Sequence, residues 1–189
     1  KNKKLIRLLI KKSQIRDYIK DLLEYQPENV ACFVGQGNTG KTSIIASLSE
    51  FFCEENQRIA LLDISKKHKL KGYFPYGRDI SRIVMDNTDT GELRSYFEAH
   101  DRDCPHLYTL DPLISHRDTD IHYLCKVIKN LSSSYDFLLI NTDEHTVSNF
   151  VDIFKLFSSI FIVHDCMLNK IHATHKMLLN IHESGIDTH

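Results

Sequence analysis

A short apolar run, Val30-Ala-Cys-Phe-Val34, ends at a cluster of glycines at positions 35, 37 and 40. Five continuously apolar residues that include valine and phenylalanine are typical of a strand buried on both faces. From Thr42 onward the apolar residues recur with helical spacing, which predicts an amphipathic helix. A buried strand that turns through glycines directly into a helix is a βα unit, and this favours an α/β fold with a parallel sheet.

The turn itself, Gly35-Gln-Gly-Asn-Thr-Gly-Lys41-Thr42, fulfils the phosphate-loop pattern G-x-x-x-x-G-K-[ST]. Because glycine has no Cβ atom, such a loop can turn its backbone N–H groups toward phosphate oxygens. We expect the Lys41 ammonium to neutralise the β- and γ-phosphates and the Thr42 hydroxyl to ligate Mg²⁺. ATP and Mg²⁺ are therefore the predicted cofactors. The predicted nucleotide-binding residues are Gly35, Gln36, Gly37, Asn38, Thr39, Gly40, Lys41, Thr42 and Ser43. A glycine turn that binds no ligand is the competing interpretation.

The rest of the chain repeats the alternation of strand and helix. Short apolar runs predict strands at 58–63, 106–110, 135–140 and 160–163, and helical periodicity predicts helices at 80–85, 91–99, 120–131, 147–157 and 170–184. Residues 65–79, rich in lysine and glycine, are predicted to form an exposed loop. The expected fold is a three-layer α/β structure with a mostly parallel sheet. Ligands of such sheets bind beyond the carboxyl ends of the strands. Gly35, Asp63, Asn141 and His164 should cluster there.

The first 26 residues differ in charge from the remainder. They carry eight Lys/Arg and three Asp/Glu, whereas the whole 189-residue chain has a formal net charge of −1. Their helical rhythm predicts a basic N-terminal helix or linker over residues 1–26, followed by a nucleotide-binding domain over residues 27–189. This helix could contact a membrane surface or an upstream domain. Tyrosines are too sparse in it for a stacking platform, so nucleic acid is not an expected partner.

Five widely spaced cysteines contain no C-x-x-C pair, which argues against a disulfide framework and for a reducing compartment. Cytoplasm is the predicted location, since the sequence shows neither a signal-peptide pattern nor a membrane-length apolar run. His172 and His175 have the spacing of metal ligands on one helix face, but no H-E-x-x-H pattern or matching carboxylate accompanies them. We interpret them as surface histidines.

Taken together, the sequence resembles the MinD/ParA family of P-loop ATPases with a deviant Walker A motif, which includes the TadZ/CpaE proteins and bacterial tyrosine-kinase domains. The matching pieces are the loop 37–42, the strand 58–63, Leu70-Lys-Gly-Tyr-Phe74, Tyr135-Asp-Phe-Leu-Leu-Ile-Asn-Thr142 and the strand and helix up to Gly185. The resemblance covers roughly residues 28–186. It implies a further strand beyond His189, so we expect the domain to be truncated at its C-terminal end.

The departures from the family pattern concern charge. A lysine that reaches the partner's phosphates in these dimers is replaced by Gln36, and the second acid of a D-x-D motif is replaced by Ser65. The acid that holds Mg²⁺ through water is replaced by Asn141. By resemblance, Lys41 and Asp63 are the catalytic candidates and Thr42 and Asp63 the metal ligands. The losses place the chain nearest to the divergent TadZ/CpaE-type members.

Three functions remain open from the sequence. The first is an ATP-binding, hydrolysis-poor dimerisation switch or scaffold that localises a pilus, secretion or division machine, as a homodimer or with a protein partner. The second is an active Mg²⁺-dependent ATPase, in which Asp143 or Asp165 replaces the lost acid and Arg78, Arg82 or Arg117 acts as an arginine finger. The third is a pseudo-ATPase interaction domain that no longer binds nucleotide.

Overall fold

The computed structural model describes residues 27–81, 97, 105–111, 118–149 and 151–186. The predicted helices at 1–26, 80–85 and 91–99 lie wholly or mostly outside these residues. No helix in the described ranges is both long enough and apolar enough to cross a membrane. Cys32, Cys125 and Cys166 are free thiols, but Cys53 is disulfide-bonded. The sequence argued against a disulfide framework, and the disulfide at Cys53 departs from that expectation, because spacing along the sequence does not determine which cysteines meet in the fold.

Six parallel strands form one sheet in the order β3-β4-β2-β5-β1-β6. Their bounds are β1 (Val30–Val34), β2 (Ile59–Asp63), β3 (Arg78–Asp79), β4 (His106–Thr109), β5 (Phe137–Asn141) and β6 (Ser159–Ile162). The predicted α/β fold with a parallel sheet is confirmed. Five of the strands follow the predicted ranges to within two residues at either end. β3 falls in the predicted loop 65–79, where two exposed polar residues give no strand signal.

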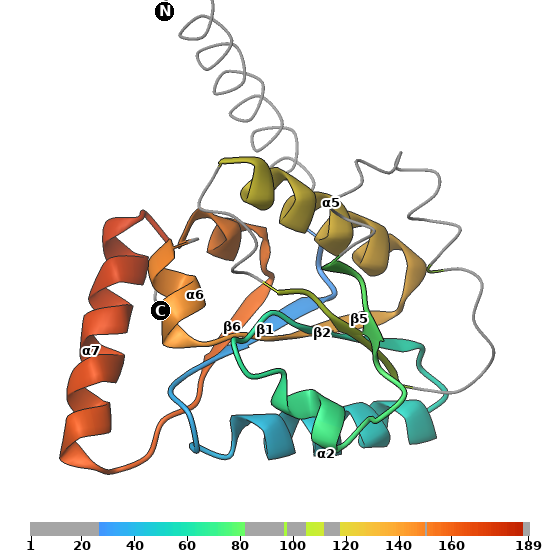
Figure 1. The fold of residues 1–189 in the computed structure, drawn as a ribbon, viewed down its shortest axis with the longest axis horizontal. Coiled ribbons are helices and arrows are strands. Elements are labelled where there is room, and N and C mark those ends of the chain that lie inside the picture. The colour runs from blue at the N-terminus through green and yellow to red at the C-terminus, as the bar shows by residue number, and fades with distance from the viewer. Residues whose placement is uncertain (1–26, 82–96, 98–104, 112–117, 150, 187–189) are drawn as a thin grey trace, which may run out of the picture.

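Helices cover both faces of the sheet, which gives the predicted three layers (Figure 1). One face carries α2 (Lys41–Glu54) and the short 3₁₀ helix η1 (Lys69–Gly72). The other carries α5 (Asp118–Ser134), the short helices α6 (Glu144–Asn149) and η2 (Val151–Leu156), and α7 (Leu168–Glu183). Alternate residues of the central strands point to opposite faces, so Cys32 packs under α5 and α7 while Phe33 packs against α2.

The predicted helix 147–157 is wrong in its bounds. A helix begins at Glu144 because Asp143 caps it, since the Asp143 Oδ1 atom accepts the backbone N–H and the hydroxyl of Thr146 at 3.0 Å. Residues Val151–Leu156 then form the separate 3₁₀ helix η2. The early start places Asp143 and Glu144 at the N-terminus of α6, directly after β5 and before the predicted start of the helix at 147.

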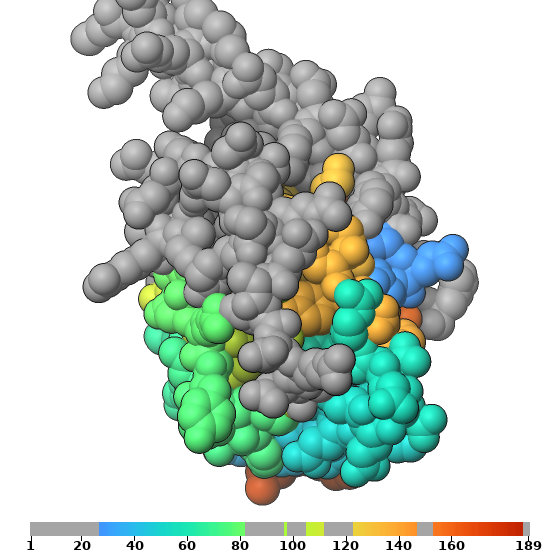
Figure 2. All heavy atoms as spheres, turned by 90° about the vertical axis from the view of Figure 1, so that its right-hand side faces the viewer, coloured from blue at the N-terminus to red at the C-terminus, as the bar shows by residue number. Residues whose placement is uncertain are grey.

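The glycine turn lies at the N-terminus of α2, at the end of the molecule remote from the viewer in Figure 2. That figure shows the opposite end, with the C-terminal part of α2 (teal) and the segment around β3 (green). Gly35 is required by packing. A Cβ atom built on it would lie 2.1 Å from the carbonyl oxygen of Val163, just after β6. Gly40 has a φ of 82°, the left-handed conformation that glycine adopts without strain, and precedes α2.

Substituting Gly35 by alanine should therefore destabilise the fold. The new methyl group meets backbone that belongs to the neighbouring strand segment and cannot rotate away, so we expect a loss of about 1–3 kcal/mol or more in unfolding free energy. Thermal or urea unfolding measures it. Gly37→Ala is the matched control, since nothing lies within 4 Å of its added Cβ. Equal losses for both variants would contradict the packing role of Gly35.

Candidate functional site

A cavity of about 710 Å³ opens at the carboxyl ends of the central strands. This volume is within the range of small-molecule sites. All nine predicted nucleotide-binding residues, 35–43, line it. The segment that follows β2 and the segment that follows β5 supply the rest: Ser65, Lys66, Lys67, Lys69, Gly72, Tyr73, Asn141, Asp143, Glu144 and His145. Asp63 and His164 are not among the lining residues, so the structure brings together only part of the predicted cluster.

Several backbone N–H groups of the glycine turn are available as hydrogen-bond donors. Within the described part of the chain, the N–H groups of residues 37–43 have no hydrogen-bond acceptor. The turn is held in shape by the Thr39 hydroxyl, which donates to the carbonyl of Gln36 at 3.1 Å, and by the left-handed backbone of Asn38 (φ 63°). A run of such N–H groups leading into a helix N-terminus is an anion-binding arrangement.

Lys41 is buried at the floor of this cavity, with 7% of its surface exposed. Its ammonium donates to the carbonyl oxygen of Thr142, just after β5. Burial lowers the pKa of Lys41, and the nearby negative charges of Asp143 and Asp63 oppose that shift. A buried ammonium whose strongest described partner is a neutral carbonyl is well suited to exchange that partner for an anionic oxygen.

Asp63 lies behind the cavity, fully buried at the end of β2. Its Oδ1 atom accepts the Ser65 backbone N–H at 3.0 Å, the Ser65 hydroxyl at 2.6 Å and the Asn141 side-chain amide at 3.0 Å. Its Oδ2 atom accepts the Leu70 backbone N–H at 3.2 Å. Both carboxylate oxygens therefore bind protein donors, and these contacts are those of an anchor for the segment 65–70. The role of Asp63 in catalysis or metal binding stays a prediction.

His68 adds a cation to this cluster. Its Nδ1 atom lies 3.8 Å from Oδ1 of Asp63, an ion pair when the imidazole is protonated. Burial disfavours the ionised form of Asp63, but the neighbouring His68 and the hydrogen bonds from Ser65 and Leu70 outweigh burial and lower its pKa. The Asp63 carboxylate in turn raises the pKa of His68. The pair stabilises the turn after β2 in the pH range where His68 carries its proton.

The acids that line the cavity also have protein partners. The Oδ2 atom of Asp143 accepts the Lys66 backbone N–H at 2.9 Å, while Oδ1 caps α6. Gln36 donates its side-chain amide to Glu144 at 3.2 Å. Asp143 was an alternative candidate for the lost acid, and its described contacts are those of a helix cap that also holds Lys66.

Other candidates lie away from the cavity or outside the described residues. Asp165 binds Lys170 and the backbone of Met167. Arg78 is in the edge strand β3 and does not line the cavity, and residues 82 and 117 are not described. His172 and His175 are exposed on α7, and the described residues contain no group of three or more His, Cys, Asp or Glu side chains that could hold a metal ion.

Sequence reasoning missed the lysines at 66, 67 and 69 and the ring of Tyr73, all of which line the cavity. Tyr73 makes a 2.7 Å hydrogen bond with Ser43 through the two hydroxyl groups. One signal in the sequence could have indicated these residues. The lysine-rich segment comes directly after a strand that ends at the ligand-binding edge of the sheet. Lysine and glycine in such a segment are typical of an exposed loop, so the lysines alone do not indicate a site.

No family model matches the sequence, and no curated protein matches it significantly. Solved structures do match. The kinase domain of the Escherichia coli tyrosine kinase ETK has a TM-score of 0.60 at 13% identity, over 85% of this chain and 65% of its own. A ParA family ATPase from Chlorobium tepidum scores 0.59 at 17% identity, over 82% and 68%. The Aquifex aeolicus MinC:MinD cell division complex scores 0.59 at 16% identity, over 83% and 64%.

These similarities are at the level of fold. The chain has the α/β fold of ParA- and MinD-type P-loop ATPases, as the sequence resemblance implied. It spans less than two thirds of the ETK and MinC:MinD chains it matches. The narrower likeness to TadZ/CpaE-type members stays a prediction.

The pair of His68 and Asp63 predicts a pH-dependent stability. The pKa of His68 is raised in the folded state, so its contribution is fully present below the ordinary value of 6.5 and is lost as pH rises through the folded pKa. His68→Asn should cost about 1 kcal/mol at pH 5.5 and much less at pH 9. Asparagine tolerates the left-handed backbone of position 68 (φ 41°).

Urea unfolding at several pH values measures this difference. His172→Asn, at an exposed position of α7, is the control and should show no pH-dependent loss. A cost for His68→Asn that is the same at pH 5.5 and pH 9 would show that the ion pair does not contribute.

Proposed function

We propose that this chain is a nucleotide-binding domain that holds Mg²⁺-ATP and hydrolyses it slowly, acting as a nucleotide-dependent switch or scaffold. One observation carries the proposal. The buried Lys41 lines a single cavity at the strand ends together with residues 37–43, whose N–H groups have no acceptor among the described residues. These N–H and ammonium donors would find no acceptor on an apolar or cationic ligand, whereas phosphate oxygens accept hydrogen bonds from them.

The residues present also fit a magnesium ion bound together with the phosphates. The Thr42 hydroxyl and Asn141 line the cavity, and the buried Oδ1 atom of Asn141 has no hydrogen-bond partner in the described structure. The orientation of the Asn141 amide follows from its neighbour, because the Asp63 carboxylate needs a donor. Neutral oxygen ligands suit Mg²⁺ when phosphates supply the negative charge. The bound ion would offset charge on the transferring phosphoryl group.

Slow hydrolysis follows from the partners of the acids. Orienting an attacking water requires a carboxylate or amide aimed at the terminal phosphate. Among the described residues, the acids that line the cavity are Asp143 and Glu144, and both bind protein donors. Asp63 is turned toward Ser65 and Leu70. Of the amides that line the cavity, Gln36 binds Glu144, Asn38 binds Lys69 and Asn141 binds Asp63. The described part of the domain thus keeps the phosphate cradle and holds no carboxylate free to orient the water.

Binding is tested by calorimetry. We expect Mg²⁺-ATP to bind the wild-type chain, and Lys41→Ala to weaken binding by at least tenfold, because a buried charge-assisted bond to phosphate is lost. Lys126→Ala, a partly buried lysine on α5 outside the cavity, is the control. No heat with the wild type would favour a pseudo-ATPase interaction domain.

Hydrolysis is tested by steady-state phosphate release. Loss of a preorganised catalytic group costs about 10²–10³ in rate, so from a typical enzyme turnover of about 10 s⁻¹ we expect about 10⁻²–10⁻¹ s⁻¹. Lys41→Ala sets the background for contaminating activity. A rate above about 1 s⁻¹ that this variant abolishes would establish an active Mg²⁺-dependent ATPase instead.

We infer further that nucleotide controls self-association or a protein partner in the cytoplasm. The fold is shared with MinD, whose solved structure is a complex with MinC, and with a ParA family ATPase. The same proposal includes the machine that is localised, which is a pilus, secretion or division apparatus. It also includes any contact of residues 1–26 with a membrane or an upstream domain. Light scattering on the calorimetry samples tests whether nucleotide drives self-association. A rise in mass on adding ATP supports it, and an unchanged mass opposes it.

A further inference from the structure

The glycine turn supplies less positive charge than its ligand requires. Lys41 is its only cation, and Gln36 is neutral and bonded to Glu144. A nucleoside triphosphate with one Mg²⁺ still carries net negative charge, and P-loop sites add further cations to offset it. The described structure therefore raises the question of which other group of this chain meets the phosphates.

The segment that follows β2 is anchored in a way that fixes its lysines beside the cavity. The backbone N–H of Lys66 binds Asp143 at 2.9 Å, and the N–H of Leu70 binds Asp63 at 3.2 Å. The Leu70 side chain is fully buried in the core under α2. The main chain on both sides of positions 67–69 is thus held by two carboxylates and a core contact.

Lys69 reaches the glycine turn. Its ammonium donates to Oδ1 of Asn38 at 2.7 Å, and its side chain lines the same cavity as Lys41. Burial is the main cause of the lowered pKa of Lys41, and the nearby charge of Lys69 adds a small contribution in the same direction. Two ammonium groups that face one cavity repel each other, and an anion between them relieves the repulsion. This arrangement favours a polyanion as the ligand.

We propose that Lys69 supplies, from within the same chain, the second cation for the outer phosphates of the nucleotide, in place of the charge absent at Gln36. The inference rests on the proposed function and assigns part of its specificity to one residue. Triphosphate is then preferred over diphosphate by a contact inside the monomer, and binding does not require a second copy of the chain. Lys69 is a binding and specificity residue.

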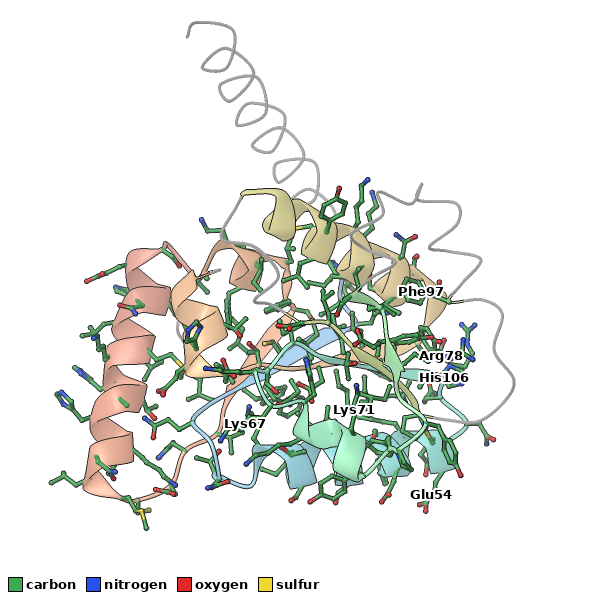
Figure 3. The ribbon with its side chains drawn as sticks, in the orientation of Figure 1. Glu54, Lys67, Lys71, Arg78, Phe97 and His106 are labelled. Atoms are coloured by element: carbon green, nitrogen blue, oxygen red, sulfur yellow. The ribbon has the colours of Figure 1, made fainter. Side chains whose placement is uncertain are left out.

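Calorimetry with Mg²⁺-ATP, ADP and AMP tests the assignment on the full chain. Lys69→Gln should weaken ATP binding about five- to tenfold, ADP binding less, and AMP binding hardly at all. Lys69→Arg should keep most of the affinity, because it keeps the charge. The matched control is Lys71→Gln, which removes an exposed lysine two residues further along η1 that does not line the cavity. Figure 3 labels Lys71 and Lys67 on this segment, with Lys67 toward the glycine turn.

The outcomes separate the two proposals. If the wild type binds ATP and Lys69→Gln binds it as well as Lys71→Gln does, the role of Lys69 is wrong while the proposed function stands. If the wild type binds no nucleotide, the proposed function fails and the inference with it. Equal unfolding curves for all three variants confirm that affinity, not folding, is compared.

A mixing experiment decides between supply within the chain and supply from a partner. Lys41→Ala and Lys69→Gln chains are titrated with ATP separately and as an equimolar mixture. If Lys69 reached across a dimer, a mixed dimer would contain one site with both lysines, and high affinity would return. We expect no recovery, because a lysine that acts within its own chain cannot complete the partner's site.

Discussion

The buried carboxylate of Asp63 is the interaction on which the rest of the site depends. It lies at the end of β2 with no exposed surface, and its two oxygens accept bonds from Ser65, Leu70 and Asn141. These bonds join the end of β2 to the end of β5 and to the lysine-bearing segment. Burying a charge without such partners would cost several kcal/mol. The segment 65–70 therefore keeps its position as long as Asp63 is ionised.

Two further contacts set the floor of the cavity. Gly35 lets the end of β1 approach Val163 after β6, and Lys41 reaches across to the carbonyl of Thr142 after β5. Because β1 lies between β5 and β6 in the sheet, these contacts connect three neighbouring strand ends. The glycine turn is thus held by the sheet before any ligand contributes. A preorganised cradle of this kind loses little conformational freedom on binding phosphate.

Much of the fold was readable from the sequence, because buried parallel strands carry continuous apolar runs and helices carry a 3.6-residue period. The exceptions have physical reasons. β3 consists of Arg78 and Asp79, both exposed, so no apolar pattern marks it. The early start of α6 depends on a cap by Asp143. The whole glycine turn was predicted to line the site because its motif is local.

The contribution of the segment after β2 to the site could not be predicted from local sequence patterns. Its lysines and glycine resemble those of an exposed loop, yet the Leu70 side chain is buried in the core and its backbone N–H binds Asp63. In the same way, comparison with the family pattern registered Ser65 and Asn141 only as missing acids. The bond from Asn141 to Asp63 depends on the pairing of β2 with β5, whereas the bond from Ser65 is local, from two residues further along the chain.

The neutral amide of Asn141 beside Asp63 gives one physical reason both for the stability of the cluster and for the slow turnover proposed. Asp63 and Asn141 are cross-strand partners, with the amide nitrogen of Asn141 3.0 Å from a carboxylate oxygen of Asp63. A second carboxylate at position 141 would repel the first unless a cation lay between them, and one of the two would hold a proton. The amide removes that repulsion, so the cluster is stable on protein donors alone. On the proposed function, an amide at position 141 also leaves no acid there to bind a metal-held water, so the stability of the site and slow turnover have a common origin.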